Sequence, residues 1–326
     1  MKTWTTAVRV SLLAALLAIA PLSAQSAPES TELTLGLPVT TATFLPIYLA
    51  DEEGYFKDEG LKVKIVAFRG GTDMVRGMLA GAVQVGCTAF AGVSVAIKAK
   101  QPIKVFYGGF NMAVFDWYAV PSIKNLKDAK GKRFGVSRLG SSTDFLTRYA
   151  LKSQGIDPKA VTIIQGGRSA PRMAAMDSGQ LDVNIFAPPE TFMAADKGYK
   201  RIVRQRDIAK DYPYHVFFAK EEFIKNNPNT IRGVLRAVIR GMRLAKSDRE
   251  RALKTLIGRI KMDPKYAGRT YDDFINDIYE DGRLPTAKGM NAFWQMGIDA
   301  GTYTEAWPES RYLDRTFMNS YGKWKP

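Results

Sequence analysis

An internal repeat constrains the fold of this chain more than any other feature of its sequence. Residues 74–89 (MVRGMLAGAVQVGCTA) align without gaps to residues 172–187 (RMAAMDSGQLDVNIFA) at a spacing of 98. Each copy has the periodicity of an amphipathic helix that ends at a glycine, Gly81 or Gly179, followed by a short alternating strand. The repeat therefore predicts two halves with the same local architecture.

The similarity continues towards the N-terminus of each half. The apolar strand at 63–66 matches the strand at 161–164 at the same spacing, and after a drift of a few residues further strands begin at Leu35 and Phe134. Each half is thus strand, helix, strand, helix, strand, which is typical of a parallel sheet covered by helices on both faces. We predict an α/β fold with two Rossmann-like lobes.

Two such lobes side by side create a crevice, and parallel α/β sheets bind ligands beyond the carboxyl ends of their strands. Helix N-termini present unpaired amides and a partial positive charge there, which suits a carboxylate, a sulfonate or a similar anion. The Ser and Thr hydroxyls at these turns would add donors, or would serve only as ordinary N-caps. The turns in question are Thr40 to Phe44, Gly70 to Thr72, Thr88 to Gly92, Ser141 to Thr143, Arg168 to Ala170, and Ala187 to Glu190.

The first residues indicate export. Lys2 and Arg9 precede an apolar run, Val10 to Ala20, which is followed by small residues up to Ala27. We expect residues 1–27 to be a cleaved secretory signal peptide. A transmembrane anchor is the alternative, but the run is shorter than the roughly 20 apolar residues that cross a bilayer. Because no cysteine follows the run, we expect no lipid anchor.

The chain is basic, with a formal net charge of +15 that includes Lys2 and Arg9 of the expected signal. Nucleic acid is one partner that such a charge suggests. The arginines of the segment 231–242, however, stand singly opposite an apolar stripe, so we expect a solvated helix face and no nucleic-acid partner. The positive field would still attract anionic solutes.

The sequence offers little for catalysis or for a cofactor. Cys87 is the one cysteine and is expected to be buried and inert, and the one histidine, His215, is expected to be a strand residue bonded to backbone. Neither a hydrolase triad nor a multi-histidine metal site can be assembled around them. The acid pairs at 52–53 and 272–273 are interpreted as solvated rather than catalytic. Because no phosphate-binding motif appears, we expect no cofactor.

Four segments carry a resemblance to a known family: TLGLPVTTATFLPIYLADEEGYFKDEGLKVKIVAF, GGTDMVRGMLAGAVQVG, IKNLKDAKGKRFGVSRLGSSTDFLTRYAL and SGQLDVNIFAPPE. At these residues the chain resembles the substrate-binding proteins of the alkanesulfonate, taurine, nitrate and thiamine-precursor type. The resemblance implies the type II periplasmic binding protein fold, with two crossings between the lobes near Trp117 to Val120 and Tyr214 to Phe218. It divides the chain into a first lobe (31–117 plus 218–326, the last part helical) and a second lobe (118–217).

The resemblance also implies a function. The chain would be a periplasmic, monomeric binding component of an ABC importer that delivers a small organic anion, a sulfonate or carboxylate, to permease and ATPase subunits. A thiamine-precursor pyrimidine or another heteroaromatic is the alternative ligand. Thiamine-pyrimidine synthases share the fold, so an exported enzyme is a further alternative, although the cysteine-rich motif of those enzymes is missing. A transcription-regulator effector domain also shares the design, but its N-terminal DNA-binding helices are replaced here by the export signal.

The resemblance further suggests which residues line the pocket. Arg168 would make a bidentate contact to a carboxylate or sulfonate, or would be a solvated surface residue. Glu190 would favour an amine, and with Arg168 a zwitterion, or would be only a first-turn helix acid. Of Phe44, Phe90, Phe110 and Trp117, at most two are expected to stack on a ligand and the rest to be core. The expected ligand-binding residues are Thr41, Phe44, Gly71, Thr72, Thr88, Phe110, Asn111, Ser141, Ser142, Thr143, Arg168, Pro188 and Glu190.

Overall fold

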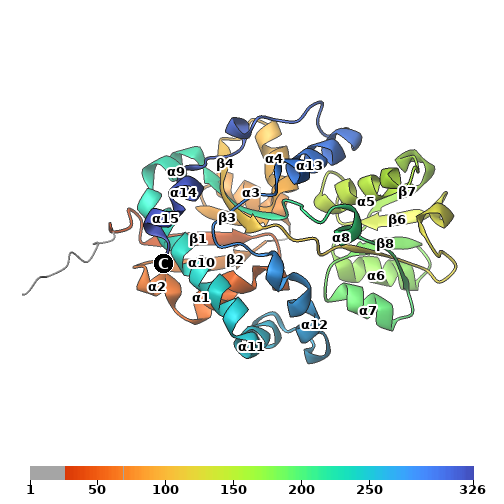
Figure 1. Ribbon diagram of the computed structural model, residues 1–326, viewed down its shortest axis with the longest axis horizontal. Helices are drawn as coiled ribbons and strands as arrows, with labels where there is room; N and C mark the ends of the chain where they lie inside the picture. The colour runs from red at the N-terminus through yellow and green to blue at the C-terminus, as the bar shows by residue number, and fades with distance from the viewer. Residues whose placement is uncertain (1–25, 69) are drawn as a thin grey trace, which may run out of the picture.

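The computed structural model describes residues 26–68 and 70–326, so the expected signal peptide lies almost entirely outside the described residues. The described chain forms two lobes, each built on one five-stranded sheet (Figure 1). This confirms the predicted two-lobe α/β fold. No helix within the described ranges is both long and apolar enough to span a membrane.

The first sheet has the strand order β2-β1-β3-β10-β4. β1 pairs in parallel with β2 and β3, whereas β10 runs antiparallel between β3 and β4. The central strands are apolar on both sides because helices cover both faces. The strands are β1 (Glu32–Leu37), β2 (Lys62–Ala67), β3 (Val85–Ala89), β4 (Ile103–Phe110) and β10 (His215–Lys220).

The second sheet repeats this arrangement in the order β7-β6-β8-β5-β9. β6 is parallel to β7 and β8, and β5 runs antiparallel between β8 and β9. The three repeated strands of each half are therefore parallel, as predicted, and each sheet also takes in one antiparallel strand, β10 or β5, that adjoins a crossing between the lobes. The strands are β5 (Asp116–Ala119), β6 (Arg133–Val136), β7 (Thr162–Gln165), β8 (Val183–Phe186) and β9 (Lys200–Arg204).

The repeat is visible in the helices and in the strand register. Helix α3 (Gly71–Leu79) and helix α6 (Ser169–Asp177) begin 98 residues apart, the spacing predicted from the sequence. Gly81 and Gly179 follow them with φ of 84° and 69°, the left-handed conformation that ends a helix at little cost only for glycine.

The central strands of the two lobes also pair in the same way. Leu35 of β1 lies opposite Ile65 and Val85. Phe134 of β6 lies opposite Ile163 and Val183. The repeat predicted from the sequence is therefore confirmed in strand pairing as well as in helix position.

The chain crosses between the lobes earlier than expected on the way out. β4 ends at Phe110 and β5 begins at Asp116, while β9 ends at Arg204 and β10 begins at His215. The family resemblance implied crossings near Trp117 to Val120 and Tyr214 to Phe218. Most of these residues instead pair within one sheet, so we infer that the lobe boundaries lie in the segments 111–115 and 205–214.

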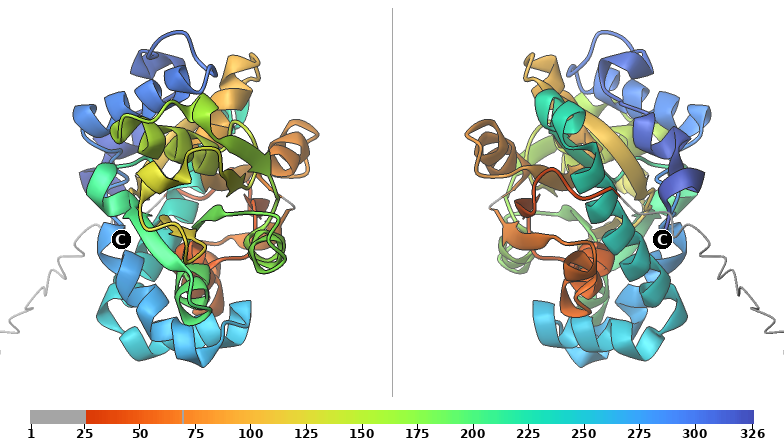
Figure 2. Two further views of the ribbon diagram at one scale, coloured as in Figure 1. Left: turned by 90° about the vertical axis from the view of Figure 1, so that its right-hand side faces the viewer. Right: turned by 90° about the vertical axis from the view of Figure 1, so that its left-hand side faces the viewer.

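Helices lie on both faces of the two sheets, and helices make up most of the C-terminal third of the chain (Figure 2). Helices α12 (Pro264–Phe274) and α13 (Ala287–Asp299) contact both lobes, whereas the other C-terminal helices pack on the first. The remaining helices are α1 (Leu45–Glu52), α2 (Tyr55–Asp58), α4 (Phe90–Lys98), α5 (Ser142–Ser153), α7 (Glu190–Asp196), α8 (Gln205–Ile208), α9 (Glu221–Asn226), α10 (Pro228–Ser247), α11 (Arg249–Ile260), α14 (Thr316–Asn319) and α15 (Tyr321–Trp324).

The long helix α10 packs its apolar stripe on α1 and α2, as predicted. Its arginine face is not simply solvated, however. Arg236 is only 7% exposed and donates both Nε and Nη2 to one carboxylate oxygen of Glu59. The helical periodicity predicted only that Arg236 lies on the polar face of α10. Arg236 is nevertheless buried, because the turn after α2 covers that face.

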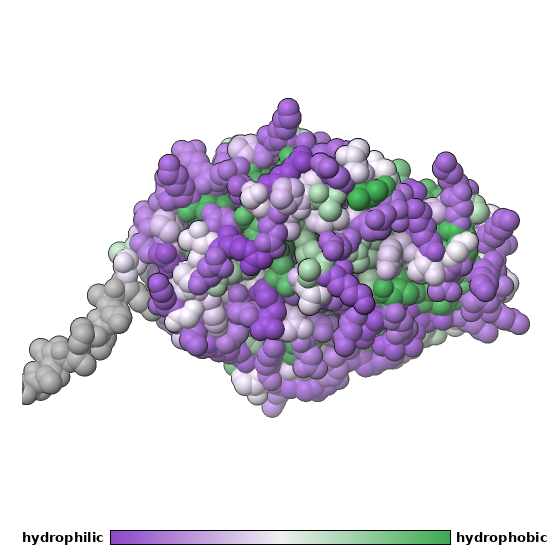
Figure 3. Space-filling view, turned by 45° about the horizontal axis from the view of Figure 1, so that its top comes forward, coloured by the Kyte–Doolittle hydropathy of each residue, from purple (hydrophilic) through white to green (hydrophobic). Residues whose placement is uncertain are grey.

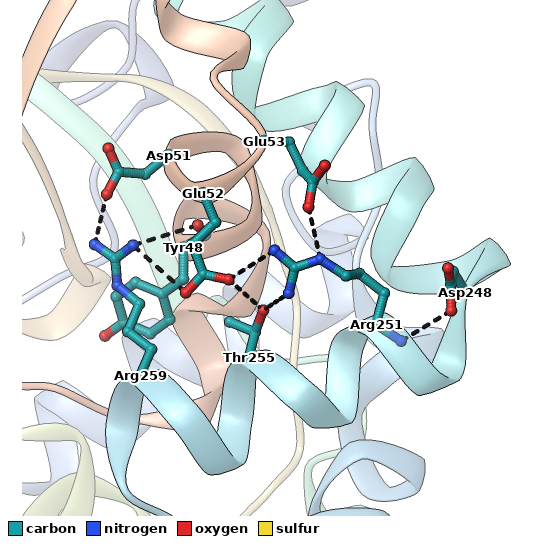
Figure 4. Close-up of polar contacts among 8 residues, drawn as sticks. All are labelled: Tyr48, Asp51, Glu52, Glu53, Asp248, Arg251, Thr255 and Arg259. Atoms are coloured by element: carbon teal, nitrogen blue, oxygen red, sulfur yellow. Dashed lines mark hydrogen bonds and ion pairs between the residues drawn. The ribbon is translucent and has the colours of Figure 1, made fainter.

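Ion pairs hold α11 against α1 (Figure 4). Arg251 contacts Glu52 at 2.9 Å and Glu53 at 2.6 Å, and Arg259 contacts Asp51 at 2.7 Å. The acids at 52–53 are exposed, as expected, but they are paired rather than merely solvated. Single surface pairs contribute little, whereas a connected set such as this one orients the two helices.

Candidate functional site

The strand directions place the predicted helix starts on one side of each lobe. Phe110, at the carboxyl end of β4, pairs with His215, the first residue of β10, so the parallel strands β1, β2 and β3 also end towards the crossings. In the second lobe, Asp116 at the start of β5 pairs with Phe186 and Arg204, so β6, β7 and β8 end there too. The carboxyl ends of both sheets therefore face each other. We call the six strand-to-helix turns and the two crossings the interlobe junction.

Side chains of the two lobes meet at this junction. Nη1 of Arg138, in the turn after β6, donates to Thr72 Oγ1 at 3.5 Å, so the first turn of α5 and the first turn of α3 lie together. At the periphery, Lys152 of α5 contacts Asp299 of α13 at 2.7 Å. The two turns that the sequence placed on opposite sides of one gap are thus neighbours.

The turns of the first lobe bring together several of the predicted residues. Gly71 and Thr88 are adjacent: a Cβ on Gly71 would lie 3.2 Å from Thr88 Oγ1. Thr88 is buried and Thr72 is exposed. The backbone N–H of Thr41, a half-buried residue, donates to the Tyr48 hydroxyl at 3.4 Å. Because Gly71 has no side chain, space for a ligand atom remains beside Thr88. Any larger residue at position 71 would fill that space.

Three rings stack where the chain returns to the first lobe. The His215 imidazole lies between Phe44, at a centroid distance of 4.4 Å, and Tyr214, at 3.8 Å. Phe110 packs against the same imidazole at 6.4 Å and is fully buried. Since Phe44 and Tyr214 cover both faces of the imidazole, only its edge remains for a polar contact.

His215 differs from the expectation of a backbone-bonded strand residue. It is 3% exposed, and its Nδ1 has no hydrogen-bond partner among the described residues. Burial lowers the pKa of His215 to about 3, so the imidazole is neutral at physiological pH. The sequence showed its strand position but not the two rings that enclose it.

Asn111 lies at the start of the first crossing. Its Nδ2 donates to the backbone oxygen of Arg283 at 3.2 Å, which ties the crossing to the C-terminal segment. Its Oδ1 is enclosed and has no partner among the described residues. The amide is therefore fixed in orientation while one acceptor remains available.

Hydroxyl groups cluster at the first turn of α5. Thr143 Oγ1 accepts from the backbone N–H of Ser137 at 2.9 Å, and Ser141 donates to the Arg138 backbone oxygen at 2.6 Å. These two hydroxyls are used within the turn, but Ser141, the N-cap residue of α5, forms no side-chain capping bond, so the alternative of ordinary N-capping does not hold for it. Ser142 Oγ is different, because it is enclosed without a partner among the described residues.

The turn after β8 places Pro188 and Glu190 beside the second crossing. Pro188 is buried, and Glu190, the first residue of α7, is half-buried. Burial raises the pKa of Glu190, and the positive charge of Arg172 opposes that rise. Burial also raises the pKa of Tyr214, and the charge of Glu190 adds to this, so the carboxyl group lies near the ring stack.

The two arginines of α6 have different surroundings. Arg168, the predicted anion contact, is exposed at the N-cap of the helix and forms no ion pair with a described carboxylate. Arg172, which sequence reasoning did not single out, is only 3% exposed. The signal that could have found it was its alignment with Met74 in the repeat, since Met74 occupies an apolar position.

Buried polar atoms without partners concentrate at the junction. Eight such side-chain atoms occur among the described residues, and six of them lie in the junction or directly beside it. Buried polar groups are almost always hydrogen-bonded, so this concentration indicates that water or a ligand completes the site. The six are Thr43 Oγ1, Asn111 Oδ1, Ser142 Oγ, Thr191 Oγ1, Tyr212 OH and His215 Nδ1.

Other predicted groups lie in the core. Phe90 packs among Phe293, Trp294 and Tyr312, and Trp117 is fully buried with Nε1 donating to Thr147. Cys87 is buried in β3, and burial raises the pKa of its thiol. No group of three or more His, Cys, Asp or Glu side chains in the described part of the chain is arranged to hold a metal ion.

Two surface hollows lie far from the junction. One, of about 230 Å³, is lined by residues of the α3–β3 turn and by α9, and the other, of about 380 Å³, lies on the neighbouring side of α9. Both are near Lys220, at the end of β10 opposite His215. They therefore adjoin the amino ends of the parallel strands, where α/β sheets do not normally bind ligands.

A family model described as NMT1/THI5 like matches residues 41–252. Among curated proteins, a putative binding protein, YtlA of Bacillus subtilis (strain 168), is 27% identical over 203 residues, which cover 57% of this chain and 58% of YtlA. The 4-amino-5-hydroxymethyl-2-methylpyrimidine phosphate synthase of Schizosaccharomyces pombe is 26% identical, and the alignment covers 61% of this chain and 60% of that enzyme. The chain thus spans about three fifths of the length of these two relatives.

Solved structures match the fold over nearly the whole chain. The alkanesulfonate-binding protein SsuA from Xanthomonas axonopodis pv. citri, bound to MOPS, superimposes with a TM-score of 0.75 at 16% identity. The match covers 88% of this chain and 99% of SsuA. At that identity the similarity concerns the fold alone.

Proposed function

The chain belongs to the NMT1/THI5-like family, and from this membership we propose that it is the solute-binding component of an ABC importer, which captures a small organic anion between its two lobes. The single observation that carries the proposal is the set of unsatisfied buried polar atoms where the helix starts of both lobes meet. A solute in that position would contact both lobes at once. It would therefore favour the arrangement in which they are closed.

An anion is the ligand class that this environment favours. Several helices begin at the junction, so their free backbone amides and partial positive charge point towards it. The excess of basic residues adds a long-range attraction for anions: the formal net charge is +15, or +13 without Lys2 and Arg9 of the expected signal peptide. The name of SsuA, an alkanesulfonate-binding protein of the same fold, supports a sulfonate as one member of this class.

We propose that the ligand-binding residues lie on both sides of the junction. Thr88, Asn111 and Ser142 combine burial with places at its turns, and His215 joins them although it was not expected. Arg168 and Thr72 are exposed and would contact the ligand only from the entrance. Phe90 and Trp117 are core residues, so Phe44 and Phe110 remain as candidates for aromatic contacts, within the expected limit of two.

The partners and location follow from the same proposal. Permease and ATPase subunits would recognise the closed form, and the expected signal peptide would direct the chain to the periplasm. Hydrophobic side chains form only separate small patches on the face shown in Figure 3, and the large exposed ones among the described residues are Val95, Leu139 and Met193. This supports a monomer rather than a subunit with a permanent apolar interface.

The test is a thermal-shift screen of the mature protein, combined with mass spectrometry of any solute that survives purification. The proposal predicts a saturable rise in melting temperature with sulfonates or carboxylates, and recovery of the solute at unchanged mass. A solute recovered as a converted product would contradict the proposal.

A second candidate, a binding protein for a pyrimidine or another heteroaromatic, is favoured by the ring stack at His215 and by the pyrimidine synthase among the relatives. A neutral heteroaromatic that raises the melting temperature more than any anion would favour this candidate. Catalysis of the synthase type finds no support in the buried, isolated Cys87.

A further inference from the structure

Arg172 is a buried cation at the carboxyl ends of β6 and β8. Its Nη1 donates to the Asn184 side chain at 2.5 Å and to the backbone oxygen of Ile185 at 2.6 Å, and its Nε donates to the Gly167 oxygen at 3.2 Å. Asn184 in turn donates back to the Arg172 carbonyl at 3.0 Å. The guanidinium is therefore held in one orientation, within the part of the second lobe that faces the junction.

The fixed guanidinium lacks a full counter-charge. Arg172 forms no ion pair with a described carboxylate, and its hydrogen bonds to described residues all start from Nε and Nη1, which leaves Nη2 free to donate. Burial lowers the pKa of Arg172 to about 10, and the negative charge of Glu190 opposes this lowering. Glu190 is therefore the one acidic group that acts on the guanidinium among the described residues. A buried charge normally has a paired partner, because its desolvation is costly.

The repeat shows that the fold does not require an arginine here. The position equivalent to Arg172 in the first lobe, 98 residues earlier, is Met74, which is fully buried. Met74 lies against Gly36 of β1, and Arg172 reaches the backbone of Gly135, the corresponding glycine of β6. Asn184, which supports the guanidinium, aligns with Gly86. An apolar side chain thus fills the same place in the other copy, and the hydrogen-bonded pair of Arg172 and Asn184 belongs to the second lobe alone.

We propose that Arg172 is the principal anion-binding group of the site, with Nη2 as the donor that a ligand oxyanion engages and Asn184 as the residue that positions the guanidinium. The proposal rests on the proposed function, because it assigns a role in capturing the same solute. It names a sulfonate or carboxylate oxygen as the atom bound. It also replaces Arg168, which is exposed, as the main contact to the anion.

The experiment is a calorimetric titration of the mature protein and its variants with methanesulfonate, taurine and benzoate, with methanesulfonamide as the neutral counterpart. Arg172→Met copies the first lobe and should weaken the anion bound by the wild type about 10- to 100-fold, as expected for loss of a charge-assisted contact. Lys159→Met removes an exposed charge from the same lobe and should leave the affinity unchanged. Arg172→Met that folds normally and binds the anion as tightly as the wild type would overturn the proposal.

Glu190→Gln provides a second test that does not depend on the folding of Arg172→Met. Removing the neighbouring negative charge should tighten anion binding several-fold while methanesulfonamide is unaffected. Unchanged or weaker anion binding by Glu190→Gln would overturn the assignment to Arg172. Failure of the wild type to bind any solute in the screen would contradict the proposed function instead, so the two failures are distinguishable.

Discussion

Tyr266 on α12 donates a hydrogen bond of 2.8 Å to the carboxylate of Asp196 on α7. The ammonium group of Lys265 lies 2.6 Å from the same oxygen. Because α12 packs on α11 and on the turn that contains Phe44, this carboxylate joins the two lobes at the periphery of the junction. The contact forms only if the lobes are close together.

Asp196→Asn is therefore expected to favour separated lobes. The substitution removes the ion pair to Lys265, and the hydrogen bonds to Lys265 and Tyr266 that hold the pKa of Asp196 low are weakened or lost. Ligand affinity should fall by about two- to fivefold, the range expected for an exposed pair. Titration calorimetry measures the change, with Asp177→Asn, whose partners Lys197 and Tyr199 lie in the same lobe, as the control. An equal effect of both variants would argue against a link between Asp196 and closure.

His215 should make stability depend on pH. Its pKa is about 3 when folded and near the ordinary value of 6.5 when unfolded, so below pH 6.5 only the unfolded chain takes up the proton. Stability should therefore fall as the pH drops from about 6.5 towards 3, by up to about 1.4 kcal/mol per pH unit from this group. His215→Phe keeps a ring between Phe44 and Tyr214 and removes the titration. Urea unfolding at about pH 7 and about pH 4.5 should show a smaller loss for the variant, and equal losses would contradict the assignment.

Removing one partner of the buried pair Arg236 and Glu59 should destabilise the protein more than replacing both by apolar residues, because a single charge is then left buried without compensation. Both side chains are 8% exposed. Glu59→Gln alone leaves the guanidinium without its partner and should lower the free energy of unfolding by about 3–5 kcal/mol. The double variant Glu59→Leu with Arg236→Met should cost clearly less. Denaturant unfolding measures the free energy of unfolding of both variants. A double variant that is less stable than Glu59→Gln would contradict this prediction.

Gly241 and Gly258, both within helices, should respond oppositely to alanine. A Cβ at Gly241 would overlap the backbone oxygen of Pro46, whereas nothing lies within 4 Å of one at Gly258. Gly241→Ala should separate α10 from α1 and destabilise the chain by at least about 1–3 kcal/mol. Gly258→Ala should stabilise it by up to about 1 kcal/mol through helix propensity. Melting temperatures of the two variants on the same side of the wild type would refute the close packing of α10 on α1.

The duplicated architecture could be predicted because its signals are local. The glycines at 81 and 179 end helices by their own conformational freedom, and the apolar pattern around them fixes which face is buried. The crossings were less predictable, since β5 and β10 are apolar strands whichever sheet they join. Only their pairing with β8 and β4 shows to which lobe Trp117 and Phe217 belong.

The candidate site was predictable at the level of turns but not of individual side chains. The six turns follow from strand order, yet the use of Ser141 and Thr143 within their own turn depends on hydroxyl rotamers that no periodicity encodes. Arg172 and Arg236 are polar residues on amphipathic helices, and their burial depends on Asn184 and Glu59, which lie elsewhere in the chain. Comparing the two copies position by position would have revealed Arg172, because its counterpart Met74 is apolar.

The account depends most on closure of the two lobes around one solute, and X-ray scattering during a titration tests this directly. A solute that raises the melting temperature should reduce the radius of gyration along the same saturation curve, with one molecule bound per chain. A solute that saturates the protein while the radius of gyration stays constant, or that binds equally well when Ser142 and Asn111 are both replaced by alanine, would contradict capture between the lobes.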